Sequence, residues 1–245
     1  MAPDFRVDLD QLAARLTPRT RLVVLTSLHN PSGARLTAED IVAIAALADQ
    51  VNAMVVIDEI YADFERDPVD VPIARLAPNV ISVNSLTKVF GLFALKCGWI
   101  AADPAILERI HACLPEGDVG VSKLSHAVAA HVLESASIFD THWREIMAET
   151  TPVMCRHAEA MMADGVISGT VPKAGCLYFP RIVGVDDTRA LARSLWREEG
   201  VIVAPGEFFG LRGHIRLGFA GQAKTLDRGL SRLHDGLRKL RGSRA

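Results

Sequence analysis

Three short apolar runs, each ended by polar residues, constrain the fold of this chain more than any other feature. They span residues 21–27, 53–57 and 79–84 and are rich in valine, isoleucine and leucine. Such runs are too short to be helices and are typical of buried strands in a parallel sheet. We therefore predict an α/β fold built on these segments.

The spacing of the runs predicts how the strands are connected. Thr37-Ala38-Glu39-Asp40 has the pattern of an N-terminal capping box, and a helical apolar period follows it to about residue 50. Strand, helix and strand in this order make parallel neighbours with a right-handed crossover. A fourth segment, residues 97–102, follows the third strand too closely for a parallel crossover, so we predict that it returns antiparallel.

The rest of the chain has a different character. A helix is predicted over residues 104–114, and residues 121–162 are mostly helical by period, which is long enough to bridge two lobes. Short strand candidates then alternate with helices, which predicts a smaller C-terminal α+β domain. The predicted strands are residues 171–180, 201–206 and 214–220, and the predicted helices are residues 188–200 and 225–241.

Charge and composition exclude several classes of protein. A net charge of -2 and a pI near 6.4 argue against nucleic-acid and anionic-membrane partners, which require concentrated Lys and Arg. Neither a membrane span nor a signal peptide is apparent, so we expect a cytoplasmic protein. The four cysteines lack metal-ligand spacing, so we expect reduced thiols and no metal site.

Polar side chains follow the three predicted parallel strands. These are Asn30, then Asp58 with Tyr61, then Ser85 with Lys88. Ligands bind outside the carboxyl ends of strands in open α/β sheets. An amine beside an acid, a phenol, an amide and a hydroxyl suits a carbonyl cofactor: the lysine forms a Schiff base, and the acid keeps a pyridine nitrogen protonated. Taken alone, Lys88 would be an ordinary surface lysine.

Four motifs together carry a family resemblance. Asn30-Pro31-Ser32-Gly33, Asp58-Glu59-Ile60-Tyr61, Ser85-Leu86-Thr87-Lys88 with Gly98-Trp99, and Ile215-Arg216-Leu217-Gly218-Phe219-Ala220 resemble, in order and spacing, the class I/II, fold type I, aminotransferases that use pyridoxal 5'-phosphate. The resemblance covers nearly the whole chain. It implies transfer of an amino group between an amino acid and a 2-oxo acid, and a homodimer if the fold is complete enough.

The resemblance also implies a domain organisation. Residues 1–118 would form a partial pyridoxal-phosphate-binding large domain, with a mostly parallel sheet sandwiched by helices. Residues 119–165 would form a long connecting helical segment, and residues 166–245 the small α+β domain.

Cofactor contacts follow from the resemblance residue by residue. Lys88 would form the Schiff base and carry the proton between the substrate α-carbon and the cofactor. Asp58 would pair with the pyridinium nitrogen, Asn30 and Tyr61 would hydrogen-bond the ring 3'-oxygen, and Ser85 would contact the phosphate. The alternative for Asp58 is a cap on the next helix.

The resemblance also assigns roles to Arg216 and Lys96 and implies that one part of the family's fold is missing. Arg216 would bind the substrate α-carboxylate through its two-pronged guanidinium, the alternative being an exposed strand arginine. Lys96 stands where the family usually has a phosphate-binding arginine, which predicts weaker anchoring. We also expect the family's N-terminal part to be absent, and with it the helix N-terminus that cradles the phosphate and the strands that pair with the sheet edges.

Other functions stay open at this point. The same cofactor groups serve lyases and cyclising enzymes, and only the substrate pocket decides between them. A different class of function is also possible from the sequence. The chain would then be a truncated, weakly active or inactive cofactor-binding remnant, or a partner domain for another polypeptide. Glu207, in a loop that in the family approaches the substrate, suggests a bias against acidic substrate side chains.

Overall fold

The computed structural model describes residues 5–64, 71–114 and 122–242 of the chain. The chain divides into two compact units: residues 1–30 with 34–140, and residues 31–33 with 141–245. The domain boundaries given above stay a prediction.

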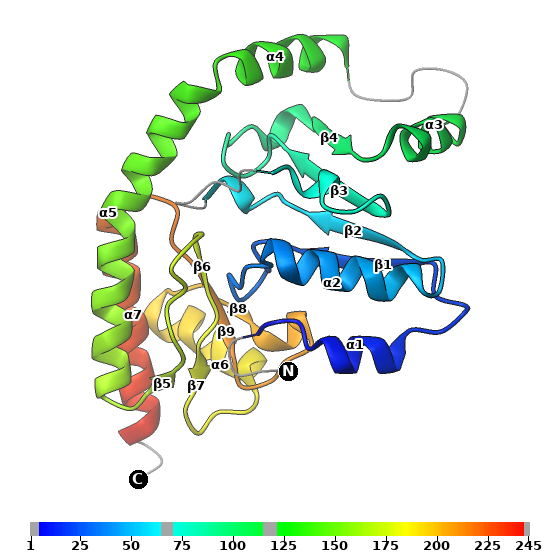
Figure 1. Ribbon diagram of the computed structural model, residues 1–245. Coiled ribbons are helices and arrows are strands. Elements are labelled where there is room, and N and C mark those ends of the chain that lie inside the picture. The colour runs from blue at the N-terminus through cyan, green and yellow to red at the C-terminus, as the bar shows by residue number, and fades with distance from the viewer. Residues whose placement is uncertain (1–4, 65–70, 115–121, 243–245) are drawn as a thin grey trace. The chain divides into compact units, whose positions relative to one another are not determined.

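A four-stranded sheet forms the centre of the first unit, in the order β1-β2-β3-β4 (Figure 1). Its strands are β1 (Leu22–Thr26), β2 (Met54–Asp58), β3 (Val80–Ser85) and β4 (Gly98–Ala101). The first three are parallel, and β4 is antiparallel to β3. This confirms the predicted α/β architecture and the predicted return of the fourth strand.

Helix α2 (Ala38–Asp49) connects β1 to β2, as the sequence predicts. It begins at the expected capping box, in which the Asp40 backbone N–H donates to the Thr37 hydroxyl at 3.1 Å and the Thr37 N–H donates to the Asp40 carboxylate at 2.9 Å. The other helices of this part of the chain are α1 (Leu9–Arg15), α3 (Pro104–Ala112), α4 (Lys123–Glu134) and the start of α5 (Ala136–Ala163), with 3₁₀ turns at Ala62–Phe64, Ile73–Arg75 and Phe93–Leu95.

One core cluster of this unit lies between α2 and one face of the sheet. Ile41 and Ile44 of α2 pack with Val55 and Ile57 of β2, and all four are buried. The prediction that all three apolar runs are buried is wrong for β1, where Val24 is 63% exposed. The reason is position: within the described residues β1 pairs only with β2, and a strand at a sheet edge is less covered than a central one.

The segment predicted as mostly helical is two helices. Helix α4 ends at Glu134, the backbone of the next residue, Ser135, leaves the helical conformation (φ -107°, ψ 23°), and α5 begins at Ala136. Pro152 lies inside α5. Periodicity does not reveal this break, because no glycine or proline marks it in the sequence.

The second unit is an α+β arrangement of helices and short antiparallel strands, as predicted. The sheets have the orders β5-β7 and β6-β9-β8. Strands β5 and β7 are absent from the sequence prediction, because strands of two residues leave no periodic signal. The elements are β5 (Ile167–Ser168), β6 (Leu177–Tyr178), β7 (Arg181–Ile182), α6 (Thr188–Ser194), a π-helical turn (Leu195–Glu199), β8 (Ala204–Pro205), the 3₁₀ turn η5 (Gly206–Phe209), β9 (Ile215–Gly218) and α7 (Ala223–Gly242).

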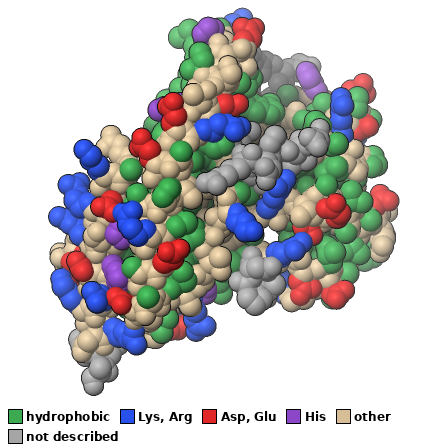
Figure 2. All heavy atoms as spheres, turned by 60° about the vertical axis from the view of Figure 1, so that its left-hand side comes forward, with side chains coloured by type: hydrophobic (Ala, Val, Ile, Leu, Met, Phe, Trp, Pro, Cys, Tyr) green, Lys and Arg blue, Asp and Glu red, His purple; other side chains and the backbone are tan. Residues whose placement is uncertain are grey.

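Charges of both signs are mixed on the face of the molecule where α5 lies (Figure 2). Asp227 of α7 accepts from Arg156 at 2.7 Å and is 2.8 Å from His157 Nε2, and Arg238 pairs with Asp164 at 2.9 Å. Across the described ranges, neither a helix long and apolar enough to cross a membrane nor a metal-binding cluster of His, Cys, Asp and Glu occurs.

Candidate active site

Lys88 lies in the turn that follows β3, with its side chain exposed. Its Nζ is 5.6 Å from the centroid of the Tyr61 ring, within the range of a cation–π contact. Tyr61 is buried and follows β2. The structure therefore brings together two of the predicted residues from the ends of neighbouring strands.

Backbone hydrogen bonds hold the turn that carries Lys88. The Leu86 N–H donates to the Cys97 carbonyl at 3.1 Å, and the Leu92 N–H donates to the Leu86 carbonyl at 2.9 Å. Gly91, at φ 67°, closes the turn with a bond to the Lys88 carbonyl at 3.0 Å. A side chain at position 91 would strain this left-handed backbone.

Asp58 is the last residue of β2, level with Thr26 of β1 and Val83 of β3. Its carboxylate accepts a hydrogen bond from the Ile60 backbone N–H at 2.9 Å. This is a local turn bond of the kind that Asp often makes two residues on, and it fixes the side chain at the carboxyl end of the strand. The following acid, Glu59, accepts instead from the Ser82 hydroxyl.

Asn30 follows β1, and its backbone N–H donates to the Thr26 hydroxyl at 3.3 Å. It lines a hollow of about 600 Å³ together with β1 residues and His29. Burial lowers the pKa of the His29 imidazole, which favours the neutral ring.

Ser85 ends β3, and its hydroxyl donates to the Thr87 hydroxyl at 2.8 Å while accepting from the Thr87 N–H at 3.2 Å. Thr87 is a polar neighbour to which the sequence analysis assigned no role. A Cβ at Gly98, opposite on β4, would lie 2.7 Å from the Asn84 carbonyl oxygen and 3.1 Å from Ser85 Cβ. The backbones of β3 and β4 therefore approach each other closely at Ser85.

Lys96 is exposed and adopts a left-handed backbone (φ 55°) at the end of the 3₁₀ turn Phe93–Leu95. The backbone carbonyl of its neighbour Cys97 accepts the hydrogen bond from the Leu86 N–H. This bond places the Lys96 backbone beside the turn that follows β3. Among the residues that the structure describes, no hydrogen bond or ion pair joins the Lys96 amine to Ser85.

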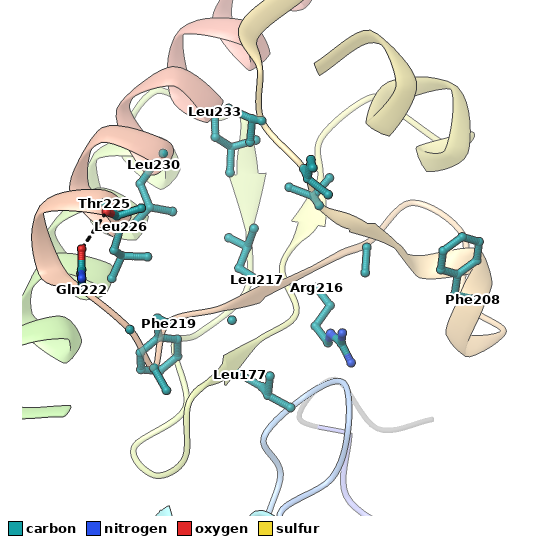
Figure 3. Close-up of a pocket in the computed structure, with 18 residues that line it drawn as sticks. Leu177, Phe208, Arg216, Leu217, Phe219, Gln222, Thr225, Leu226, Leu230 and Leu233 are labelled. Carbon is teal, nitrogen blue, oxygen red and sulfur yellow. Dashed lines mark hydrogen bonds between the residues drawn. The ribbon is translucent and has the colours of Figure 1, made fainter. Parts of the chain in front are cut away.

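Arg216 belongs to the second unit, on β9, and is partly buried. It points to the opposite side of the strand from Leu217, which faces Leu230 and Leu233 of α7 (Figure 3). These residues line a hollow of about 620 Å³. The Arg216 guanidinium carbon is 4.9 Å from the centroid of the Phe209 ring.

Glu207 is bound within the second unit. Its carboxylate accepts from the Thr188 N–H at 2.9 Å and from the Thr188 hydroxyl at 2.5 Å. Burial raises the pKa of the Glu207 carboxyl, but the hydrogen bonds from Thr188 outweigh this effect and hold the pKa below its usual value. The contacts therefore give Glu207 a structural role at the start of α6.

Comparison with known proteins gives a consistent result. The family model described as aminotransferase class I and II matches residues 1–233. The chain is 31% identical over 236 residues to capreomycidine synthase of Streptomyces vinaceus, covering 95% of this chain and 60% of that protein. It is 27% identical to aromatic-amino-acid aminotransferase 2 of Thermococcus litoralis, covering 96% of this chain and 62% of that protein.

A solved structure agrees with the sequence comparisons. The crystal structure of a PLP-dependent aminotransferase from Streptococcus suis matches with a TM-score of 0.86 and 25% identity, over 96% of this chain and 62% of that one. The chain thus spans about 60% of the length of the relatives it matches. On this evidence, the chain belongs to the class I and II aminotransferase family.

Proposed function

We propose that this chain binds pyridoxal 5'-phosphate and transfers an amino group between an amino acid and a 2-oxo acid. The observation that carries the proposal is the Lys88 amine over the Tyr61 ring, at the same sheet edge as Asp58. The names of the aminotransferase relatives support the same reaction. Since the chain covers only part of their length, the activity is a proposal for this chain.

The donor set at the carboxyl ends of β1, β2 and β3 fits the chemical groups of the cofactor. Asp58 offers a carboxylate to a ring nitrogen, Asn30 and Tyr61 offer hydrogen-bond donors to a ring oxygen, and Ser85 offers a hydroxyl to a phosphate. Lys96 would add a positive charge at the phosphate end. When bound, pyridoxal 5'-phosphate supplies an aldehyde that a lysine amine can bond and a ring that withdraws electrons from the substrate α-carbon.

Each residue then has a defined task. Lys88 Nζ would move the proton on and off the substrate α-carbon. Asp58 would hold a proton on the ring nitrogen. Arg216, on the second unit, would bind the substrate carboxylate in a two-pronged ion pair and orient the amino acid.

One specific observation favours a second type of reaction, that of a lyase or cyclising enzyme. A relative at 31% identity is named a synthase rather than an aminotransferase. The same catalytic lysine serves several reactions, and the substrate pocket decides between them. Assaying the chain with an amino acid alone and then with an added 2-oxo acid separates the two branches, because only transfer requires the second substrate.

Absorbance spectroscopy with purified protein tests the cofactor proposal. The visible band of pyridoxal 5'-phosphate should shift on mixing with the native chain, and borohydride reduction should fix the cofactor to the Lys88 peptide, as located by mass spectrometry. Lys88→Ala should abolish both signals, and Lys123→Ala, at the exposed start of α4, should retain them. A folded native chain with no shift would favour the remnant or partner-domain alternative.

Subunit association and cellular location stay predictions. The family resemblance implies a homodimer, and the composition is that expected of a cytoplasmic protein. Sedimentation of the native chain with and without cofactor would determine the first.

A further inference from the structure

Lys88 is the first residue of a tight turn that follows β3. The turn ends at Gly91, whose N–H donates to the Lys88 carbonyl at 3.0 Å, and Phe90 stands just before that glycine. One backbone hydrogen bond stabilises a turn only weakly, because water competes for the same groups. The position of the lysine therefore depends on what else holds the turn.

The side chain of Phe90 provides a tertiary contact for the turn. Its ring centroid lies 5.5 Å from that of Phe139, near the start of α5, and the ring planes are tilted by 58°. This distance and tilt are in the range that aromatic pairs prefer. The contact joins the turn to a helix that comes much later in the chain.

A buried cluster extends this contact. Leu86 comes shortly before the turn, and its side chain is fully buried in a cluster with Ala129 and Val132 of α4. Phe90 and Phe139 pack against the same cluster as partly buried residues. The turn is therefore packed on α4 and on the start of α5 through residues on either side of the lysine.

The lysine depends on this support because its own side chain is exposed. Packing of that side chain does little to fix the amine, so the backbone of the turn must do so. A reacting group that is displaced by about 1 Å can react about a hundredfold more slowly. An aromatic contact two residues beyond Lys88 is well placed to hold that backbone.

We propose that Phe139 is a positioning residue, which holds the turn through Phe90 so that the Lys88 amine stays over the Tyr61 ring. This inference rests on the proposed function, because the position of the amine matters for catalysis only if Lys88 bonds the cofactor. It assigns a role to an aromatic residue of α5 for which the sequence gives no functional signal.

Two forms of the cofactor separate this role from a general loss of structure. The Lys88 amine condenses with the aldehyde of pyridoxal 5'-phosphate and releases water, whereas pyridoxamine 5'-phosphate has an amine instead and binds without that bond. Stopped-flow absorbance of the native full chain and its variants gives the rate of bond formation. Fluorescence titration gives the affinity for pyridoxamine 5'-phosphate.

Phe139→Leu keeps an apolar side chain in the cluster but removes the ring. It should slow bond formation to Lys88 about tenfold and leave the affinity for pyridoxamine 5'-phosphate unchanged. Phe139→Tyr keeps the ring and should restore the rate. Ile138→Ala, one position earlier on α5 and 67% exposed, is the matched control and should retain the native rate. An unchanged rate in Phe139→Leu, or an equal loss of rate and affinity, would overturn the positioning role.

Hydrogen exchange followed by nuclear magnetic resonance tests the turn without any cofactor. The Gly91 N–H is bonded to the Lys88 carbonyl, so its exchange reports how often the turn opens. Exchange at Gly91 should be about fivefold faster in Phe139→Leu than in the native chain, and unchanged in Ile138→Ala. Equal exchange at Gly91 in Phe139→Leu and the native chain would contradict the inference.

The two proposals fail in different ways. A native chain that bonds the cofactor at Lys88, and does so equally fast in Phe139→Leu, overturns the positioning role alone. A native chain that binds neither form of the cofactor overturns the proposed function, and with it the catalytic part of this inference.

Discussion

At position 96 the type of cation decides how a phosphate can be held. Lysine is a compact point charge on a flexible stem, whereas arginine presents a planar fork that matches two phosphate oxygens. Lys96 is exposed, and its backbone is fixed in the left-handed region at the end of a 3₁₀ turn. Replacing Lys96 by arginine therefore changes the geometry of the hydrogen-bond donors. The conformational energy of the left-handed backbone stays the same, because neither residue has a branched Cβ.

Lys96→Arg should tighten binding of pyridoxal 5'-phosphate. We expect the dissociation constant to fall about fivefold, since one additional solvent-exposed hydrogen bond contributes about 1 kcal/mol net. Fluorescence titration of the cofactor into both proteins measures the change. Lys123→Arg, at the exposed start of α4, is the control and should not alter affinity; equal affinities for Lys96→Arg and the native chain would remove Lys96 from the site.

At the scale of elements, the close pairing of β3 with β4 supports the end of the strand that carries Ser85. Gly98 pairs with Ser85 in the antiparallel register. The space beside Gly98 is occupied by the Asn84 carbonyl and by Ser85 itself, so a larger residue would push the two strands apart. The glycine of the Gly98-Trp99 motif therefore has a physical cause in strand packing.

Gly98→Ala should destabilise the chain by about 1–3 kcal/mol, the usual cost of overpacking, and should also weaken cofactor binding by displacing Ser85. Urea denaturation followed by circular dichroism gives the free energy of unfolding, and cofactor titration gives the affinity. Gly221→Ala, where open space surrounds the added methyl group, should change stability by less than about 0.5 kcal/mol. Equal effects of the two substitutions would contradict the steric argument.

At the scale of the whole molecule, stability at high pH depends on a buried phenol. Tyr178 is almost fully buried and donates to the Gly169 carbonyl at 3.1 Å, and burial raises its pKa from 10.0 to about 12. The folded state therefore keeps a proton that the unfolded state loses. The resulting stabilisation is complete below about pH 10 and is lost as the pH rises towards about 12.

The urea midpoint of the native chain should accordingly fall between about pH 9.5 and pH 11.5, and part of this fall should disappear in Tyr178→Phe. Comparing the two proteins removes the contribution of lysines, which titrate in the same range in both. Parallel pH profiles for the native chain and Tyr178→Phe would show that the phenol ionises equally in the folded and unfolded states.

Much of the first unit could be predicted because its signals are local. The capping box at Thr37 and Asp40 is a contact between residues close in sequence, and the apolar period of α2 follows from helical geometry. The connection from Ser85 to Gly98 is close to the shortest length that a parallel crossover requires, which favours the antiparallel return. The placement of Asp58 and Ser85 at strand ends follows from where the apolar runs stop.

Several features could not be predicted from the sequence, because they produce no local signal. The break at Ser135, the two-residue strands β5 and β7, and the exposure of Val24 leave no periodic or compositional mark in the sequence. Glu207 shows the same limit: its position in a loop suggested a role in substrate choice, whereas its partner Thr188 lies nineteen positions earlier in the chain.

The sequence by itself thus determined the α/β class, the strand order along the chain and the family, because these depend on residue type, period and spacing. Only the tertiary structure decided that Lys88 lies over Tyr61, that Gly98 closes on Ser85, and that Phe209 stands beneath Arg216. Each of these contacts joins residues of different elements, and its formation depends on packing between the elements rather than on any local preference of the residues themselves.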